Sequence, residues 1–224
     1  MVSKPLIIAI DGPSGAGKGT VSRAVAARLG YRHVDTGAMY RAVAWRALRD
    51  GVDLGAEHAV AAIGERATFN LEQGHVAIDG DDVAAAIRTP EIDRASAIVA
   101  RHPAVRRALV ARQRAMGERG GVVMEGRDIG TVVFPVADLK IYLDASPEER
   151  ARRRAADPAH ASSRTAQLSD VATALAERDK SDSTRAASPL AVATDAVVID
   201  TTGVSVDDVI ERVLSLVAQH GDRP

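Results

Sequence analysis

Near its N-terminus the chain carries a glycine-rich loop, which lies between an apolar run and the start of a helix, at residues 7–20. Gly12, Gly17 and Lys18 have the spacing G-x-x-x-x-G-K of a P-loop, a motif whose backbone N–H groups bind phosphates. Glycine lets the backbone curl close to an anion, and the positive end of the following helix attracts that anion. Lys18 can then reach the outer phosphates of a nucleotide, whereas a purely structural turn would not need a lysine there. The pattern predicts a strand, a phosphate-binding loop and a helix, in that order.

Composition limits the classes of protein that this chain can represent. Its 224 residues suit one large domain, and 46% hydrophobic residues can build a sizeable core. A formal net charge of -1 and only 3% aromatic residues argue against nucleic-acid binding and against general attraction to membranes. The absence of cysteine excludes disulfides and cysteine-ligated metals. No apolar run approaches the roughly 20 residues of a membrane span, and the N-terminus shows no signal-peptide pattern, so we expect a cytoplasmic monomer.

Beyond the loop, apolar runs alternate with stretches of helical periodicity that end at glycine, proline or capping residues. The predicted strands cover residues 6–10, 122–124, 139–143 and 197–199. The predicted helices cover residues 18–29, 36–50, 56–66, 103–116, 147–154, 165–185 and 207–218. Strands that alternate with helices imply a parallel sheet with helices on both faces, joined by right-handed crossovers. We therefore predict an α/β fold of the P-loop NTPase type.

Between the third and fourth of these helices, the strand–helix alternation is interrupted. Two strand-like runs, at residues 67–71 and 75–78, are separated by Glu72-Gln73-Gly74. A second turn follows at residues 79–81, and two short helical pieces follow at residues 84–88 and 90–101. The runs and turns predict a β-hairpin. Because a hairpin does not belong to a series of parallel strands, we interpret this region as an insert on the core.

Ligands of parallel sheets bind beyond the carboxyl ends of the strands. Four segments are expected to share a cleft there, namely the P-loop, residues 35–37, residues 125–128 and Asp144. Gly126 permits a sharp turn, Arg127 can clamp a phosphate, and Asp128 can accept a hydrogen bond from an amino group; the alternative is a capped turn with a local ion pair. Arg41, about one turn inside its helix, could bind a second anion, although its periodicity alone fits a position on the helix surface better.

A further pattern surrounds the polar loop at residues 157–163. Four arginines precede this loop, namely Arg150, Arg152, Arg153 and Arg154. Two arginines and an aspartate follow it, namely Arg178, Arg185 and Asp182. Like charges so close together repel one another in a free helix and are better tolerated where anions bind. A helix–loop–helix cover over bound phosphates would also exclude water from phosphoryl transfer. An exposed basic helix face is the alternative.

Together these motifs resemble the bacterial cytidylate kinase family, whose members are nucleoside monophosphate kinases. The resemblance runs nearly from end to end and is carried by residues 10–20, 35–41, 80–83, 87–88, 103–106, 125–135 and 177–179, with Asp182 and Arg185. The G-K-G-T ending of the P-loop, in which Gly19 precedes Thr20, occurs in kinases of small-molecule nucleotides. The run G-R-D-x-G-T-V-V-F-P that begins at Gly126 is far more specific than the P-loop.

The resemblance implies ATP-dependent phosphorylation of CMP and dCMP to CDP and dCDP, with Mg²⁺ accompanying ATP. It implies catalytic roles for Lys18, Arg41, Arg127 and Asp128. It implies ATP binding by Gly12, Pro13, Ser14, Gly15, Ala16, Gly17, Lys18, Gly19 and Thr20, with Thr20 near Mg²⁺, and by Arg150 and Arg154 of a lid. It implies CMP binding by Asp35, Thr36, Tyr40, Arg41, Ser96, Arg106, Arg127, Asp128, Arg178, Asp182 and Arg185.

The same resemblance implies one domain over residues 1–224, with a core at 1–62 and 102–224, a monophosphate-binding insert at about 63–101 and a small lid at about 150–166. One position departs from the family pattern. A serine that contacts the base usually stands where this chain has Ala97, and Ser96 lies one residue earlier. Either a local shift restores the hydroxyl or one contact with cytosine is missing.

Two other functions stay open at this stage. The first is another small-molecule P-loop kinase, acting on UMP, AMP or shikimate; the extended G-R-D run and the hairpin insert argue against it. The second is a nucleotide-binding regulatory module without turnover. Such modules usually carry an N-K-x-D motif that reads guanine, and this sequence has none.

Overall fold

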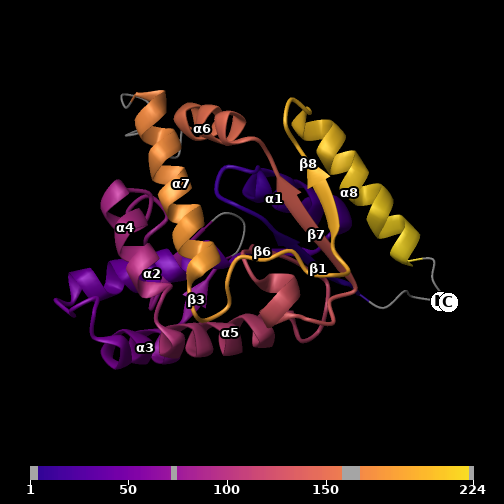
Figure 1. The fold of residues 1–224 in the computed structure, drawn as a ribbon. Helices are drawn as coiled ribbons and strands as arrows, with labels where there is room; N and C mark the ends of the chain where they lie inside the picture. Colours follow the sequence, from indigo (N-terminus) through magenta and orange to yellow (C-terminus); the bar gives the residue numbers. More distant parts are fainter. Residues whose placement is uncertain (1–4, 72–74, 158–166, 222–224) are drawn as a thin grey trace.

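The computed structural model describes residues 5–71, 75–157 and 167–221. A five-stranded sheet lies at its centre, with the strand order β2-β6-β1-β7-β8 (Figure 1). Its strands are β1 (Ile7–Asp11), β2 (Arg32–Asp35), β6 (Val122–Gly126), β7 (Leu139–Asp144) and β8 (Val197–Asp200). Each pair of neighbouring strands in this sheet is parallel. The predicted α/β fold with a parallel sheet is therefore confirmed.

Helices flank this sheet (Figure 1). They are α1 (Lys18–Leu29), α2 (Thr36–Arg49), α3 (Glu57–Arg66), α4 (Pro90–Val99), α5 (Pro103–Gly117), α6 (Pro147–Ala156), α7 (Leu168–Thr184), α8 (Val206–Gly221) and the short π-helix η1 (Ile129–Val133). Capping residues determine several ends: Asp35 accepts from the Ala38 N–H at 2.9 Å to begin α2. Gly30 ends α1 in the left-handed conformation. Among the described helices, none is both long and apolar enough to cross a bilayer.

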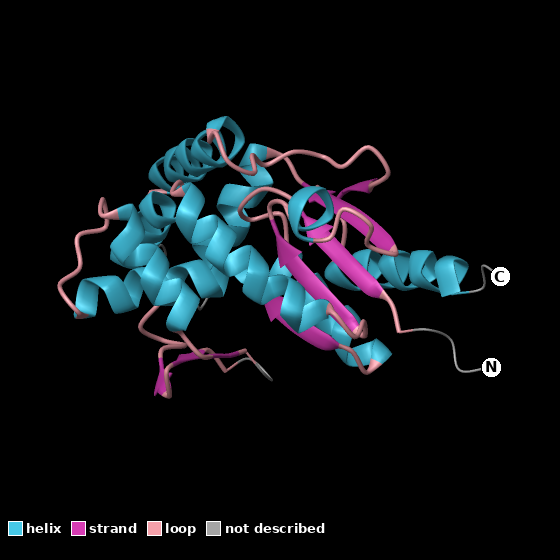
Figure 2. Cartoon of the chain, turned by 90° about the horizontal axis from the view of Figure 1, so that it is seen from below, coloured by secondary structure: helices cyan, strands magenta, loops and turns pink. Residues whose placement is uncertain are grey.

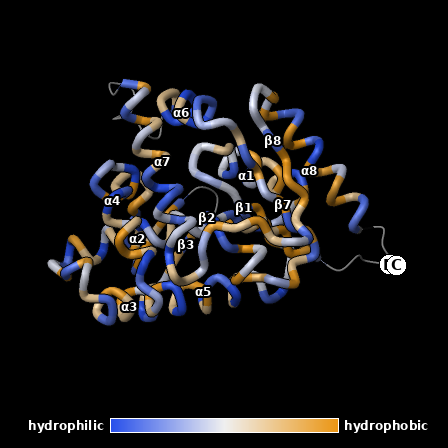
Figure 3. The backbone as a smooth tube through the Cα atoms, viewed as in Figure 1, coloured by the Kyte–Doolittle hydropathy of each residue, from blue (hydrophilic) through white to orange (hydrophobic). Residues whose placement is uncertain are grey.

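The centre of the sheet is buried on both faces because alternate residues of β1 and β6 point into two different hydrophobic cores. Ile8 and Ile10 of β1 pack with α1 and α8. Ala9, which lies between them, packs with α5 and η1 on the opposite face. Figure 3 shows hydrophobic residues concentrated along the central strands, whereas α6 is mostly hydrophilic. The continuous apolar run before the P-loop is thus explained by burial of β1 on both faces.

The segment predicted as an insert contains a small antiparallel sheet of β3 (Phe69–Asn70), β4 (Ala77–Ile78) and β5 (Asp81–Asp82). Figure 2 shows it set apart from the central sheet. Phe69 pairs with Ile78, as the predicted hairpin requires, while the predicted turn at 72–74 lies outside the described residues. A third short strand, β5, was not predicted.

The helical piece predicted at residues 84–88 is wrong. The chain there makes a single turn, in which the Ile87 N–H donates to the Val83 carbonyl at 3.0 Å. It cannot run on into α4 because Thr89 precedes a proline and is extended, with φ -106° and ψ 154°. Thr89 instead caps α4, its hydroxyl accepting from the Ile92 N–H at 3.2 Å.

Candidate active site

The P-loop connects β1 to α1, and its backbone requires glycine. Gly12 has φ 146°, and a Cβ atom on it would lie 2.0 Å from the Leu143 carbonyl oxygen of β7. Gly15 has φ 82°, and its Cβ would lie 2.9 Å from the Arg150 carbonyl oxygen of α6. Both positions combine a left-handed backbone with close contact to another element. The loop is therefore held between β7 and α6 in one curled shape.

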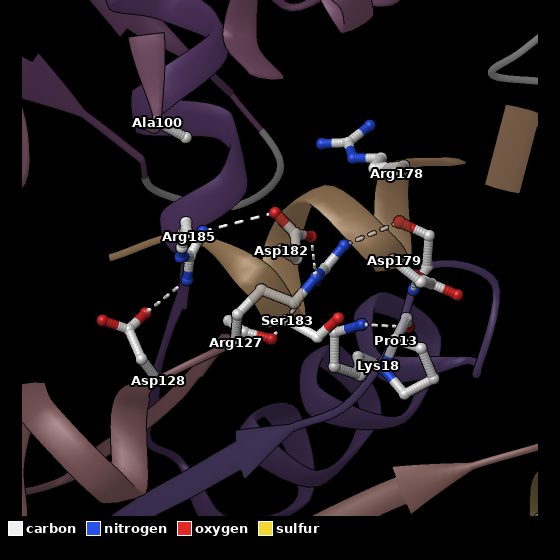
Figure 4. Close-up of polar contacts among 12 residues, drawn as sticks. Pro13, Lys18, Ala100, Arg127, Asp128, Arg178, Asp179, Asp182, Ser183 and Arg185 are labelled. Carbon is white, nitrogen blue, oxygen red and sulfur yellow. Dashed lines mark hydrogen bonds and ion pairs between the residues drawn. The ribbon is translucent and has the colours of Figure 1, made fainter. Parts of the chain in front are cut away.

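Lys18, the first residue of α1, is buried at the base of this loop with only 7% of its surface exposed. Its Nζ donates to the Pro13 carbonyl oxygen at 2.6 Å, a contact visible in Figure 4. Burial, aided by the nearby charge of Arg127, lowers the pKa of Lys18 to about 7. The lysine is thus partly neutral until a negative group approaches it.

The loop opens onto one cleft of about 750 Å³ at the carboxyl ends of the strands. The start of α2, the turn after β6 and the helices α4, α6 and α7 contribute to its walls, as predicted for a shared cleft. Asp144 is the exception, because it does not line the cleft and its carboxylate accepts from the Ala145 N–H at 2.9 Å. Of the predicted site residues, all line the cleft except Gly12, Pro13 and Arg150.

Arg127, directly after β6, joins the P-loop to α7. Its Nη2 donates to the Ser14 hydroxyl at 2.7 Å, and its Nε donates to Asp182 Oδ2 at 2.9 Å. The other oxygen of Asp182 accepts from Arg185 Nη1 at 3.3 Å. Burial by itself would raise the pKa of Asp182, but the charges of Arg127 and Arg185 outweigh burial and lower it. Figure 4 shows Asp182 between the two arginines.

Asp128 continues this network toward α5. Its Oδ2 accepts from Arg106 Nη2 at 2.6 Å, and its Oδ1 lies 3.8 Å from Arg185 Nη2. Both Arg106 and Asp128 are buried, with 3% and 5% of their surfaces exposed. The Arg106 guanidinium also lies over the Tyr40 ring, 5.2 Å from its centroid. A buried pair of opposite charge, flanked by an aromatic ring, therefore forms one wall of the cleft.

Three side-chain groups in this wall have a buried donor atom without a hydrogen-bond partner among the described residues. These atoms are Tyr40 Oη, Arg106 Nε and Arg185 Nη2. Because buried donors are nearly always satisfied, such atoms in a cleft point to acceptors that a ligand brings. The wall therefore offers the carboxylate of Asp128 as an acceptor beside guanidinium donors that lack hydrogen-bond partners.

Two more predicted arginines lie in the cleft beside carboxylates. Arg41 Nη2 donates to Asp35 Oδ2 at 3.0 Å, so Arg41 occupies the cleft rather than the outer surface that its periodicity favoured. Arg178 of α7 donates from Nη1 to Asp93 Oδ1 of α4 at 3.1 Å. Asp35 and Arg41 both belong to the start of α2, whereas the Arg178–Asp93 pair ties α7 to α4 at the edge of the cleft.

Three predicted residues use their polar groups within the protein. Arg150 donates from Nη1 to the Ser14 carbonyl at 3.2 Å and also to Asp179, whose Oδ1 accepts from the Ser14 N–H at 3.2 Å. The Thr36 hydroxyl donates to the Glu125 carbonyl at 2.8 Å. The Ser96 hydroxyl donates to the Asp93 carbonyl of its own helix at 2.9 Å, while Ala97 also lines the cleft. Whether these three residues contact nucleotides stays a prediction.

Sequence reasoning assigned no individual role to three groups that the structure places here. Arg88 lines the cleft from the segment between β5 and α4. Glu125, within the segment 125–128 that was expected in the cleft, does line it, and its Oε1 lies 2.9 Å from His33 Nε2. Asp179 holds the P-loop from α7, and its position three residues before Asp182 was an available signal, because such residues share a helix face. Residues 158–166 of the lid predicted at about 150–166 lie outside the described residues.

A phosphate-binding loop on a parallel sheet, opposite an arginine-rich cleft, defines the P-loop kinase class. The fold is similar to a shikimate kinase from Bacteroides thetaiotaomicron, with a TM-score of 0.51, 12% identity and coverage of 95% of this chain and 98% of that one. It is also similar to a gluconokinase from Sinorhizobium meliloti, with a TM-score of 0.50, 15% identity and coverage of 98% and 95%. At these identities the likeness concerns the fold alone.

Sequence relatives narrow this class. The family model described as Cytidylate kinase matches residues 8–219. The cytidylate kinase of Solibacter usitatus is 50% identical over 220 residues, covering 96% of this chain and 93% of that protein. The cytidylate kinase of Desulfitobacterium hafniense is 48% identical over 218 residues, covering 96% and 94%. The chain belongs to the cytidylate kinase family.

Proposed function

We propose that this protein transfers the γ-phosphoryl group of ATP to CMP and dCMP, forming CDP and dCDP. The observation that carries the proposal is the wall opposite the P-loop, where Asp128 and donors of Arg106 and Arg185 that lack hydrogen-bond partners offer a set of hydrogen bonds to a base. Membership of the cytidylate kinase family supports the same reaction. The division of the chain into core, insert and lid remains a prediction.

ATP would occupy the P-loop half of the cleft. Backbone N–H groups of the loop and the Lys18 ammonium would hold its phosphates, and Arg154, which lines the cleft from α6, would cover them. The loop needs little rearrangement because Gly12 and Gly15 already hold its curled shape. Its order before binding reduces the entropic cost of fixing the polyphosphate.

The donor groups near the loop suit a Mg²⁺ ion that arrives with ATP. Mg²⁺ usually keeps several waters and binds substrate phosphates with one or two protein oxygens. Thr20 is exposed to the cleft in the first turn of α1 and would supply one such oxygen. Within residues 5–71, 75–157 and 167–221, no cluster of three His, Asp or Glu could hold a metal by itself. When bound, the ion neutralises charge on the transferred phosphoryl group.

CMP would occupy the opposite half. Arg41, Arg127 and Arg178 would hold its phosphate through charge-assisted hydrogen bonds, exchanging carboxylate partners for phosphate oxygens. The Asp128 carboxylate would accept from the exocyclic amino group of cytosine, and these guanidinium donors of Arg106 and Arg185 would reach the ring acceptors. Uracil presents a carbonyl where cytosine has this amino group, so two acceptors would face one another and UMP would bind less well.

The chemical step needs no strong general base. The second ionisation of a phosphate monoester lies near pH 6, so the acceptor is already largely dianionic at neutral pH. One of its oxygens attacks the γ-phosphorus of ATP, and the bond between that phosphorus and the β–γ bridging oxygen breaks, releasing ADP. The difficulty is to align two polyanions. Lys18 and the cleft arginines therefore act by positioning and by neutralising charge.

Acceptor preference tests this proposal. We expect rapid ADP formation with CMP and dCMP, and kcat/KM at least about tenfold lower with UMP and AMP, because the base wall loses hydrogen bonds. A coupled ADP-release assay with matched acceptor concentrations measures this. Preference for UMP or AMP would assign a different kinase specificity. Nucleotide binding without acceptor-dependent ADP release would instead favour a regulatory module.

The charge state of Lys18 gives a prediction about pH. Because burial lowers its pKa to about 7, much of Lys18 is neutral at about pH 7.5, and nearby phosphates would raise that pKa again. ATP binding should therefore take up a substantial fraction of a proton at about pH 7.5 and less as the pH falls below the pKa. Titration calorimetry in two buffers of different ionisation enthalpy measures the uptake. Lys18→Met should abolish it, and a buffer-independent enthalpy for the unmodified protein would contradict it.

A further inference from the structure

Asp11 is a buried carboxylate that the proposed mechanism does not use. It ends β1, with 5% of its surface exposed, directly before the P-loop. Its Oδ1 accepts from the Ile129 N–H at 2.9 Å, and its Oδ2 accepts from the Gly130 N–H at 2.8 Å. Both oxygens thus bind the first N–H groups of η1, the π-helix that follows Asp128 in the crossover from β6 to β7.

These N–H groups belong to the start of a helix, where backbone donors lack partners within the helix. An aspartate at the N-cap usually accepts one of them, as Asp35 does for α2 in this same cleft. Asp128 holds the N-cap position of η1, yet its side chain makes no capping hydrogen bond. It pairs instead with Arg106 at 2.6 Å. A residue from a neighbouring strand therefore caps η1 in place of its own N-cap residue.

We propose that Asp11 is a positioning residue for recognition of the acceptor base. By taking both N–H groups of η1, it leaves the Asp128 carboxylate free to pair with Arg106 and to accept from an amino group of the ligand. The inference rests on the proposed function, because it assigns a purpose to the orientation of Asp128 within the same site.

The need for two acceptor oxygens explains why a carboxylate stands at this position. Burial raises the pKa of Asp11 to about 6, which shows that the ionised carboxylate is less favourable here than in water. An asparagine would avoid buried charge but could accept from only one of the two N–H groups, and its amide hydrogens would face the other. Asp128 would then be drawn into the ordinary capping position, away from Arg106.

The test compares Asp11→Asn with Asp138→Asn. Asp138 is a matched control, because its Oδ2 also accepts a backbone N–H of β1, that of Ile7 at 2.7 Å, but at the opposite end of the strand. For Asp11→Asn we expect KM for CMP to rise about tenfold and the CMP-to-UMP ratio of kcat/KM to fall by a similar factor, with KM for ATP within about twofold of the unmodified protein. Asp138→Asn should leave KM for CMP, KM for ATP and the CMP-to-UMP ratio unchanged.

A double variant shows whether Asp11 acts through Asp128. In an Asp128→Asn background, Asp11→Asn should cause little further loss of CMP specificity, because the carboxylate that it orients is already gone. The proposal would be overturned if the two substitutions reduced CMP specificity independently, so that the double variant lost the product of the two single losses. It would also be overturned if Asp11→Asn left KM for CMP and the base preference unchanged. Unmodified protein that makes no CDP from CMP would instead refute the proposed function.

Thermal melting separates positioning from folding. If Asp11→Asn does not fold, Asp11→Ser retains one acceptor in a smaller side chain and takes its place in every measurement. If both variants fail to fold while Asp138→Asn folds, Asp11 has a structural role only and the proposal is wrong.

Discussion

Lys18→Ala should lower kcat by about a thousandfold or more while the protein remains folded. The lysine supplies positive charge where the transferred phosphoryl group becomes most negative, and the P-loop has no second lysine to replace it. Its loss should cost little stability, because burial disfavours its charge in the folded protein and its Nζ contacts only the Pro13 carbonyl among the described hydrogen bonds. Initial-rate kinetics of ADP release and a melting curve measure both effects.

Lys140→Ala is the matched control for this variant. Lys140 is equally buried, and its Nζ also donates at 2.6 Å to the carbonyl of a proline five residues earlier, Pro135, but it lies outside the cleft. Both variants thus lose a buried lysine, but only Lys18 lies where the phosphates of ATP would bind. Near-normal ADP release by folded Lys18→Ala protein would refute the role of the P-loop lysine.

Arg127→Ala should lower kcat/KM for CMP by about a hundredfold or more, and should weaken ATP binding much less. Arg127 lies between the two halves of the cleft, bonded to the Ser14 hydroxyl on one side and to Asp182 on the other. Its guanidinium is therefore placed to hold the acceptor phosphate against the donor. Initial rates with each substrate varied in turn, together with ATP titrations without acceptor, separate the two effects.

Arg107→Ala provides the comparison, because Arg107 is exposed on α5 and does not line the cleft. A melting curve is needed for Arg127→Ala, since its removal leaves buried Asp182 with less compensating charge. A folded Arg127→Ala protein with unchanged kcat and unchanged KM for CMP would contradict the role of this arginine in the acceptor site.

Much of the architecture could be predicted because single residues determine local geometry. Aspartate is typical of helix starts and glycine of helix ends, and Asp35 caps α2 while Gly30 ends α1. The curled P-loop follows from glycines such as Gly12, whose backbone conformation and contact with β7 exclude a side chain. Parallel strands then bring the loop, Asp35 and the turn after β6 to the same edge of the sheet.

Side-chain partners could not be predicted, because they depend on distances between elements far apart in the sequence. Arg127 pairs with Asp182, 55 residues away, although other carboxylates lie nearer in the chain. The Ser96 hydroxyl was a candidate for a base contact, but in α4 it bonds to the carbonyl three residues before it. A five-residue π-helix such as η1 has no periodicity that a sequence pattern would reveal.

The edge strand β2 escaped prediction for a related reason. Its residues Arg32-His33-Val34-Asp35 contain one apolar side chain, and only Val34 is buried. Backbone pairing with β6, rather than an apolar pattern, makes this segment a strand. The same pairing sets His33 beside Glu125 at the cleft, a contact that the sequence pattern of β2 did not reveal.

The paired arginines have a consequence for the protein without its substrates. Their partners in the folded chain are carboxylates, in the pairs Arg41–Asp35, Arg106–Asp128, Arg127–Asp182 and Arg178–Asp93. The chain therefore carries its own counter-ions to the place that receives two polyanions. Mutual repulsion among the cations is relieved before any nucleotide enters, so nucleotide supply adds stability by mass action without being a condition for folding.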